Sequence, residues 1–103
     1  MSNELEVKKD YYDSGKLKKE NHYKNRERDG LETCWYENGE KWVEISSMDG
    51  KKIGIETCWY ENGNKKHTKH FNDGTENGIR KEWDEDGTLT YEGNYIDGAE
   101  EIK

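Results

Sequence analysis

A strict internal repeat constrains this chain more than any other feature of its sequence. Residues 32–39 and 56–63 both read ETCWYENG, 24 positions apart (56 − 32 = 24). A period of this size is typical of arrays in which no single unit can bury its own apolar face. The same step of 24 relates a series of glycines, Gly15, Gly39, Gly63 and Gly87. It also relates a series of aromatic residues, Tyr11, Trp35, Trp59 and Trp83. The sequence therefore predicts about four stacked 24-residue units.

Each unit has the pattern of a β-hairpin, two alternating runs joined by a glycine-containing turn. The turns read DSG at 13–15, ENG at 37–39 and 61–63, and EDG at 85–87. A two-residue turn would place Ser14 at positive φ, which serine tolerates poorly. A three-residue loop needs that conformation only at the glycine. We therefore expect an all-β chain, a single antiparallel meander sheet of about seven or eight short strands, curled by its own twist.

The loop length fixes an expected register, in which residue 36 faces 40 and residue 35 faces 41. Strict alternation then places odd-numbered residues on one face of the sheet. This face would hold nearly every strong apolar residue, namely Tyr11, Leu17, Tyr23, Leu31, Trp35, Val43, Ile45, Ile55, Trp59, Phe71, Ile79, Trp83, Leu89, Tyr91 and Tyr95. The even-numbered face is expected to be polar.

Composition suits a thin, aromatic-rich core. The chain is 28% hydrophobic and 40% charged, yet it holds four Trp and seven Tyr, which bury large areas per residue. We expect a lead at 1–8, a repeat domain at 9–98 and a tail at 99–103. The beginning resembles no signal peptide, and no run has transmembrane length, so we expect a cytoplasmic protein.

Net charge is −7, and residues 82–103 account for all of it, with eight acids and one base. An acidic chain is a poor candidate for direct binding to nucleic acid or to an anionic membrane. Charge runs also solvate strand edges, and the basic strand at 65–70 is best explained in that way.

Glycine-led strands, paired aromatics and an acidic turn resemble the MORN repeat, and within it the bacterial variant labelled YwqK-type antitoxins. The pieces that carry the resemblance are GLETCWYENGE, GIETCWYENGN, GIRKEWDEDGT and, in part, YYDSGKL, within residues 9–98. The resemblance implies a hairpin sheet that binds a protein, and the antitoxin label implies a toxin partner. The fourth unit departs from the pattern, because Asp84 replaces the second aromatic and Glu82 replaces the cysteine. Choline-binding and cell-wall-binding repeats are less similar, since their aromatics mainly follow the turn.

The two cysteines are expected to be free thiols. Cys34 and Cys58 share one repeat position with a strand between them, which separates them by roughly 9–10 Å. A disulfide needs Cα atoms within about 7 Å. His22 and His70 are expected on the cysteine face but toward the far strand ends, so no metal site and no cofactor are predicted. No catalytic arrangement stands out, and we expect no enzyme activity.

Aromatics on the even-numbered face are the candidate contact residues. They either anchor a partner or form a stiffening cross-strand ladder. The predicted partner-binding residues are Tyr12, Tyr36, Trp42, Tyr60, Glu82, Asp84, Glu85 and Asp86.

The main hypothesis is a non-enzymatic antitoxin or inhibitor that binds a basic protein such as a nucleic-acid-processing enzyme, a toxin nuclease or a defence nuclease. The alternatives are a carbohydrate or cell-surface binding repeat and a membrane-associated MORN scaffold. Two molecules would also cover a half-exposed apolar face as a homodimer.

Overall fold

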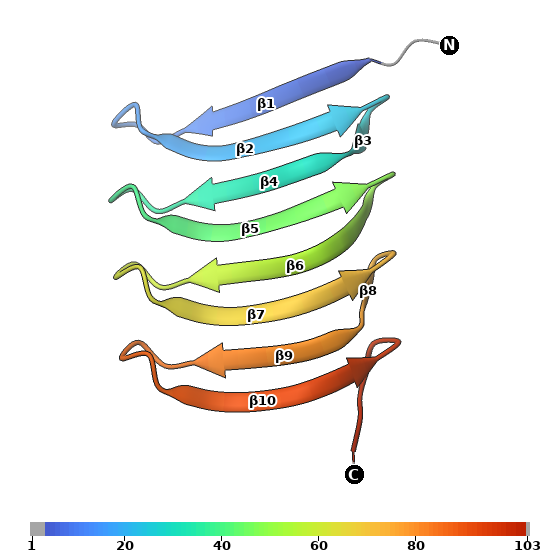
Figure 1. The fold of residues 1–103 in the computed structure, drawn as a ribbon. Helices are drawn as coiled ribbons and strands as arrows, with labels where there is room; N and C mark the ends of the chain where they lie inside the picture. The colour runs from blue at the N-terminus through green and yellow to red at the C-terminus, as the bar shows by residue number, and fades with distance from the viewer. Residues whose placement is uncertain (1–3, 103) are drawn as a thin grey trace.

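A computed structural model describes residues 4–102, which form one antiparallel sheet whose strands follow one another in chain order (Figure 1). The predicted fold class is confirmed, and so is the number of main strands. Eight strands have six to nine residues: β1 (Leu5–Tyr11), β2 (Leu17–Lys24), β4 (Gly30–Trp35), β5 (Lys41–Met48), β6 (Lys51–Trp59), β7 (Lys65–Asn72), β9 (Gly78–Trp83) and β10 (Leu89–Ile96). Three strands have two residues: β3 (Glu27–Arg28), β8 (Thr75–Glu76) and β11 (Ala99–Glu100). The sheet thus extends into the expected lead and tail. Within residues 4–102, no helix has the length and apolarity to cross a membrane.

Four turns lie in a row at one end of the strands (Figure 1). We name this row the hairpin edge (residues 12–16, 36–40, 60–64 and 84–88). In each, the first residue donates its N–H to the carbonyl four positions later, at 2.8–2.9 Å. The only positive φ in each loop is at its glycine: Gly15 (90°), Gly39 (93°), Gly63 (90°) and Gly87 (91°). These are the three-residue loops that the sequence predicts.

Shorter turns lie along the opposite edge. They contain two residues, both at positive φ, which matches the right-handed strand twist. These turns are Asn25-Arg26, Asp49-Gly50, Asp73-Gly74 and Asp97-Gly98. In the last three, the glycine N–H donates at 2.8–2.9 Å to a carbonyl of the preceding unit, at Arg28, Lys52 and Glu76. The turn itself therefore joins neighbouring units.

A one-residue bulge after each hairpin-edge turn overturns the expected single apolar face. Trp35 pairs with Lys41 as predicted, but Cys34 pairs with Val43, which leaves Trp42 unmatched. The extra residues in the other hairpins occupy the same repeat position: Lys18, Lys66 and Thr90. Because a bulge inserts one residue, it exchanges the faces of every residue beyond it.

Apolar residues are consequently divided between two faces. The Ile45 face holds Val43, Ile45 and Ser47 of β5 beside Cys34 and Cys58. The Trp59 face holds the Trp row of the repeat together with an aliphatic row. That row, Val7, Leu31, Ile55 and Ile79, is 42–55% exposed.

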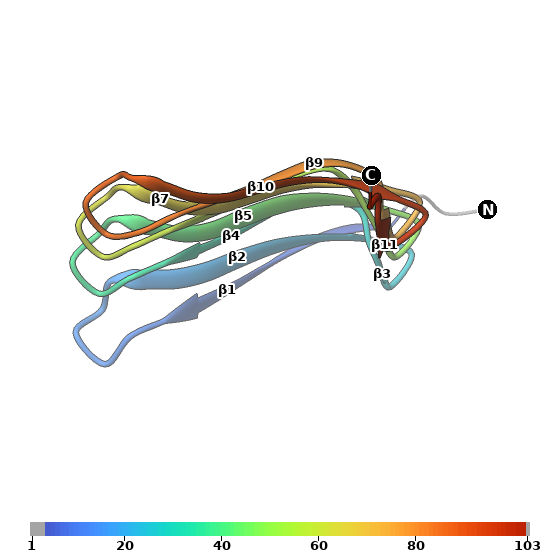
Figure 2. The ribbon, with the colours of Figure 1, turned by 90° about the horizontal axis from the view of Figure 1, so that it is seen from below.

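The sheet is a single layer of 48 × 38 × 12 Å, gently curved when seen along its edge (Figure 2). Among the described residues, Ile45 is the one buried hydrophobic side chain, at 4% exposure. The other buried side chains are polar: Asn21, Thr33, Ser47 and Glu56. The expected thin core is therefore thinner still, and strand pairing and polar cross-strand contacts hold the sheet together.

Candidate functional site

Tyrosines at one repeat position join each hairpin to the next. The hydroxyl of Tyr12 donates to the Trp35 carbonyl at 2.6 Å. Tyr36 reaches the carbonyl of Trp59 at 2.7 Å, and Tyr60 that of Trp83 at 2.8 Å. These part-buried bonds form the cross-strand ladder that the sequence offered as an alternative to a binding role. The phenols stiffen the sheet, and only their rings are left for contact with a partner.

Bulge residues sit against these tyrosine rings. The Trp42 ring stacks on the Tyr36 ring, with centroids 5.6 Å apart and planes at 28°. Lys18 and Lys66 occupy the equivalent place, with their ammonium groups 5.4 Å and 5.7 Å from the ring centres of Tyr12 and Tyr60. Trp42 remains 45% exposed. Of the predicted aromatics, it offers an exposed large surface without being hydrogen-bonded into the ladder.

The hairpin edge is acidic. Its four segments hold seven acids (Asp13, Glu37, Glu40, Glu61, Asp84, Glu85 and Asp86) and one base, Lys16, a net −6 (1 − 7) of the chain's −7. The last three turns are joined into a continuous ridge, because the Asn38 side-chain amide donates to the Glu61 carbonyl at 2.8 Å. Asn62 likewise donates to the Glu85 carbonyl at 3.0 Å. The charge is therefore presented along a single rigid edge.

Asp84 and Glu82 have structural roles as well. Oδ1 of Asp84 accepts the N–H groups of Asp86 and Thr88, both at 3.0 Å, and so holds the last turn. Glu82 lies on the Ile45 face, where Oε2 is 3.7 Å from Nη1 of Arg80. Neither carboxylate is a free surface charge in the way that those of Glu61 and Glu85 are.

Shallow grooves on both sides of Tyr60 bring most of the predicted residues together. One is lined by Tyr36, Tyr60, Glu61, Asn62 and Glu85. The other is lined partly by Tyr60, Glu82 and Asp84. Tyr12, Trp42 and Asp86 line neither groove. The predicted site is therefore centred on the hairpins of the second, third and fourth units.

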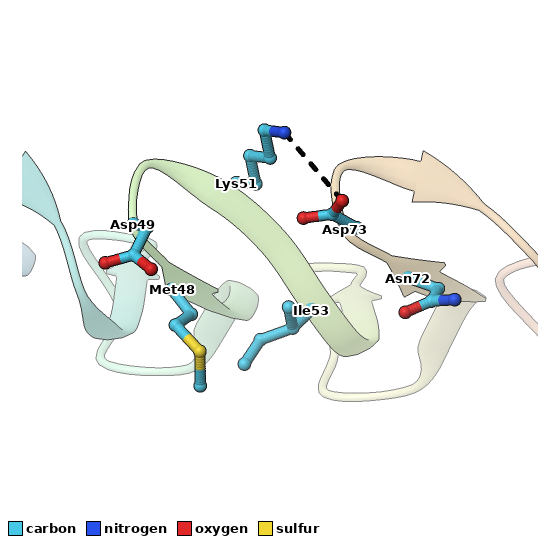
Figure 3. A pocket seen from close by; sticks show the side chains of 6 residues that line it. All are labelled: Met48, Asp49, Lys51, Ile53, Asn72 and Asp73. Carbon is cyan, nitrogen blue, oxygen red and sulfur yellow. Dashed lines mark ion pairs between the residues drawn. The ribbon is translucent and has the colours of Figure 1, made fainter.

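A separate pocket lies at the opposite edge, between the turns of β5–β6 and β7–β8 (Figure 3). Met48, Asp49, Ile53 and Asn72 line it with Lys51 and Asp73, whose ion pair spans 3.8 Å. Both charged side chains are mostly exposed, so the pair contributes little stability. No residue predicted to bind a partner lines this pocket.

Both cysteines are free, as predicted, and they flank Val43 from the two neighbouring strands. The expected placement of the histidines was wrong, again because of the bulge. His70 pairs with Ile55 on the Trp59 face, and His22 lies on that face too. The histidine that faces a cysteine is His67, opposite Cys58.

His67 belongs to a polar cluster that sequence reasoning missed. Its Nε2 is 3.3 Å from Oε1 of Glu56, whose Oε2 is 2.8 Å from Nζ of Lys52. The contacts with His67, and then with Lys52, lower the pKa of Glu56 to about 2 despite its burial. Burial, followed by the Glu56 charge, raises the pKa of the Cys58 thiol to about 11. One signal in the sequence could have predicted the bulge: Trp42 and Val43 are adjacent apolar residues, which breaks the alternation of apolar and polar residues after the turn.

Comparison with known proteins agrees with this architecture. The family model of the MORN repeat variant matches residues 7–25, 28–47, 52–73 and 76–97. Each matched segment covers all or nearly all of the two long strands of one hairpin. No curated protein and no solved structure matches the chain. Four family matches cover most of the sequence, and the chain belongs to the MORN repeat variant family.

Proposed function

We propose that this protein is a non-enzymatic binding module whose hairpin edge docks a basic protein, and that it acts as an antitoxin or inhibitor of that partner. MORN repeats are generally protein-binding repeats, which supports the first part. The observation that carries the proposal is the gathering of acidic turns and aromatic rings along one edge. The resemblance to YwqK-type antitoxins supports the inhibitory role.

Charge complementarity points to the kind of partner. The net −6 at the hairpin edge (1 − 7) comes from the last three turns, which hydrogen bonds join, because Asp13 and Lys16 cancel in the first turn. Such an acidic ridge attracts a basic surface and raises the association rate most at low salt. Enzymes that process nucleic acids carry basic substrate grooves, because they must hold phosphates. A toxin nuclease or a defence nuclease is therefore the partner we propose.

Aromatic contact supplies the second part of the docking surface. Trp42 is 45% exposed and is held by its stack on Tyr36, which is fixed by the bond to the Trp59 carbonyl. An aromatic ring that is already immobilised loses little freedom on binding, which is why tryptophan is enriched among residues that dominate affinity. The groove between Tyr36 and Tyr60 would receive a basic side chain next to Glu61 and Glu85.

The test compares two triple variants in a pull-down from nuclease-treated native lysate over a range of salt concentrations. Glu37→Gln, Glu61→Gln and Glu85→Gln together remove three exposed carboxylates but leave the backbone carbonyls that accept the inter-turn bonds. The matched control removes three carboxylates from the opposite edge, and asparagine tolerates their positive φ. It consists of Asp49→Asn, Asp73→Asn and Asp97→Asn.

We expect a partner that the parent and the control retain, and that the hairpin-edge variant and Trp42→Ala lose. Its retention by the parent should fall as salt rises. The purified partner should also lose activity when the parent is added. Equal retention by both triple variants would reject the hairpin edge as the docking surface. A partner that remains fully active in the complex would reject the inhibitory role.

A second candidate function is carbohydrate binding, which the half-exposed Tyr36–Trp42 stack favours. Aromatic faces stack on sugar rings without needing charge. Glycan binding would be lost in Trp42→Ala and kept in the hairpin-edge triple variant. That pattern separates it from the protein-binding proposal.

A further inference from the structure

Three side chains of different chemistry converge on the Ile45 face between β6 and β7. The carboxylate of Glu56, the thiol of Cys58 and the imidazole of His67 have their ligating atoms within 4.8 Å of one another. They are the one group of three potential metal ligands at this separation among residues 4–102. Glu56 is 8% exposed, and the His67 side chain is 20% exposed.

The spacing of these atoms fits a small tetrahedral ion. Zinc binds imidazole nitrogen at about 2.0–2.1 Å, carboxylate oxygen at about 2.0–2.2 Å and thiolate sulfur at about 2.3 Å. Tetrahedral angles then separate the ligand atoms by roughly 3.3–3.6 Å. Nε2 of His67 and Oε1 of Glu56 are already 3.3 Å apart. The ion would replace the direct contact between them, and Sγ of Cys58, which lies within 4.8 Å of both atoms, would move closer to complete the set.

The surroundings provide the outer contacts that a ligating carboxylate needs. Lys52 occupies Oε2 of Glu56 at 2.8 Å and leaves Oε1 directed at His67. Such an outer hydrogen bond fixes the orientation of a ligating group. Because three protein atoms are available, the fourth position of the ion would be open to solvent or to an external ligand.

We propose that Oε1 of Glu56, Sγ of Cys58 and Nε2 of His67 bind one Zn²⁺ ion. The thiol binds as thiolate and releases its proton to solvent, so affinity increases as pH rises. The mixed donor set of sulfur, nitrogen and oxygen suits zinc. It does not suit Mg²⁺ or Ca²⁺, which prefer sites made of oxygen ligands alone. This inference is independent of the proposed docking at the hairpin edge.

The repeat provides an internal control. In the second unit, Glu32 and Cys34 occupy the same repeat positions, within the identical ETCWYENG segment. There Val43 takes the place of His67. At the three ligand positions, the third unit therefore differs from its neighbour only in the residue that supplies the imidazole. His67→Val copies a side chain that the same fold already accommodates on this face.

The experiment titrates the full chain with Zn²⁺ in competition with a chromophoric chelator, and with Co²⁺ while absorbance is recorded. We expect one ion per chain and a thiolate-to-cobalt charge-transfer band in the near ultraviolet. Cys58→Ser and His67→Val should each weaken binding by at least ~10-fold, the loss that even outer-contact mutations reach. The Cys58→Ser variant should also lose the charge-transfer band. The matched control Cys34→Ser should leave both measurements unchanged.

Circular dichroism without metal verifies that each variant keeps its strand content. Equal Zn²⁺ affinity of the parent and a folded His67→Val variant would overturn the proposal. So would Co²⁺ binding without a thiolate band, or a band that Cys34→Ser removes. Absence of stoichiometric binding in the parent at neutral pH would overturn it as well.

Discussion

Replacing Tyr12, Tyr36 and Tyr60 with phenylalanine removes three hydroxyls from the ladder between successive hairpins and leaves every ring in place. The hydroxyls donate to carbonyls at 2.6, 2.7 and 2.8 Å in part-buried positions. A net hydrogen bond stabilises a protein by about 0.5–1.5 kcal/mol. The free energy of unfolding of native proteins is about 5–15 kcal/mol. A combined loss of roughly 3 kcal/mol is therefore a large fraction of the total stability.

Urea unfolding followed by circular dichroism measures this loss. We expect a lower midpoint with an unchanged denaturant slope, because the buried area hardly changes. The control is Tyr11→Phe, since Tyr11 is 57% exposed and its hydroxyl makes no hydrogen bond within residues 4–102. A triple variant within about 0.5 kcal/mol of the Tyr11→Phe control would refute the stabilising role of the ladder.

The same ladder predicts sensitivity to alkali. Burial, and next the nearby Glu61 charge, raise the pKa of Tyr36 above its ordinary value of 10.0. A raised folded-state pKa gives stability that is fully present below pH 10 and lost as pH rises through the folded pKa. Unfolding free energy should therefore fall above pH 10, and less steeply in Tyr36→Phe. Identical slopes in both proteins would contradict this assignment.

Three further substitutions test other parts of the sheet. Asn21→Ile should stabilise the fold by about 1–2 kcal/mol in urea unfolding, because Oδ1 of Asn21 is buried without a hydrogen-bond partner and the next unit has isoleucine there. Glu76→Gln should weaken the fold at pH 7, because the hydrogen bond from Arg80 lowers the pKa of Glu76 and so stabilises the folded state. That contribution is lost as pH falls below the unfolded-state pKa of 4.5, so the variant should lose less stability in acid than the parent. Gly78→Ala should lower the melting temperature, because its φ is 131° and a Cβ would lie 2.9 Å from Cβ of His70.

The sequence was sufficient for the architecture and the turns, and the reason is local. A glycine at a fixed place in each loop, with Ser14 excluded from positive φ, determines the loop length at the hairpin edge. Loop length then determines the first strand pair, Trp35 with Lys41, which was predicted correctly. Local chemistry was enough because a tight turn involves only its own few residues.

The bulge was not predictable by the same reasoning, since no glycine marks it. Trp42, Lys18, Lys66 and Thr90 occupy the extra position, and these residues share no backbone preference. The bulge is instead supported by the contacts of side chains in space, such as the stack of Trp42 on Tyr36. Without the bulge, strict alternation places the side chains of β7 on the wrong faces. His67 is then predicted on the face opposite to Cys58, so it is not recognised as a possible metal ligand.

The acceptors of the tyrosine ladder have a consequence for how such proteins change over evolution. Each hydroxyl bonds to a main-chain carbonyl of the next unit, and the Asn38 and Asn62 amides do the same. A carbonyl is present whatever side chain the neighbour carries. In-frame duplication or deletion of the second or third hairpin therefore leaves each junction with a tyrosine donor and a carbonyl acceptor, so related genes can differ in repeat number without compensating substitutions elsewhere.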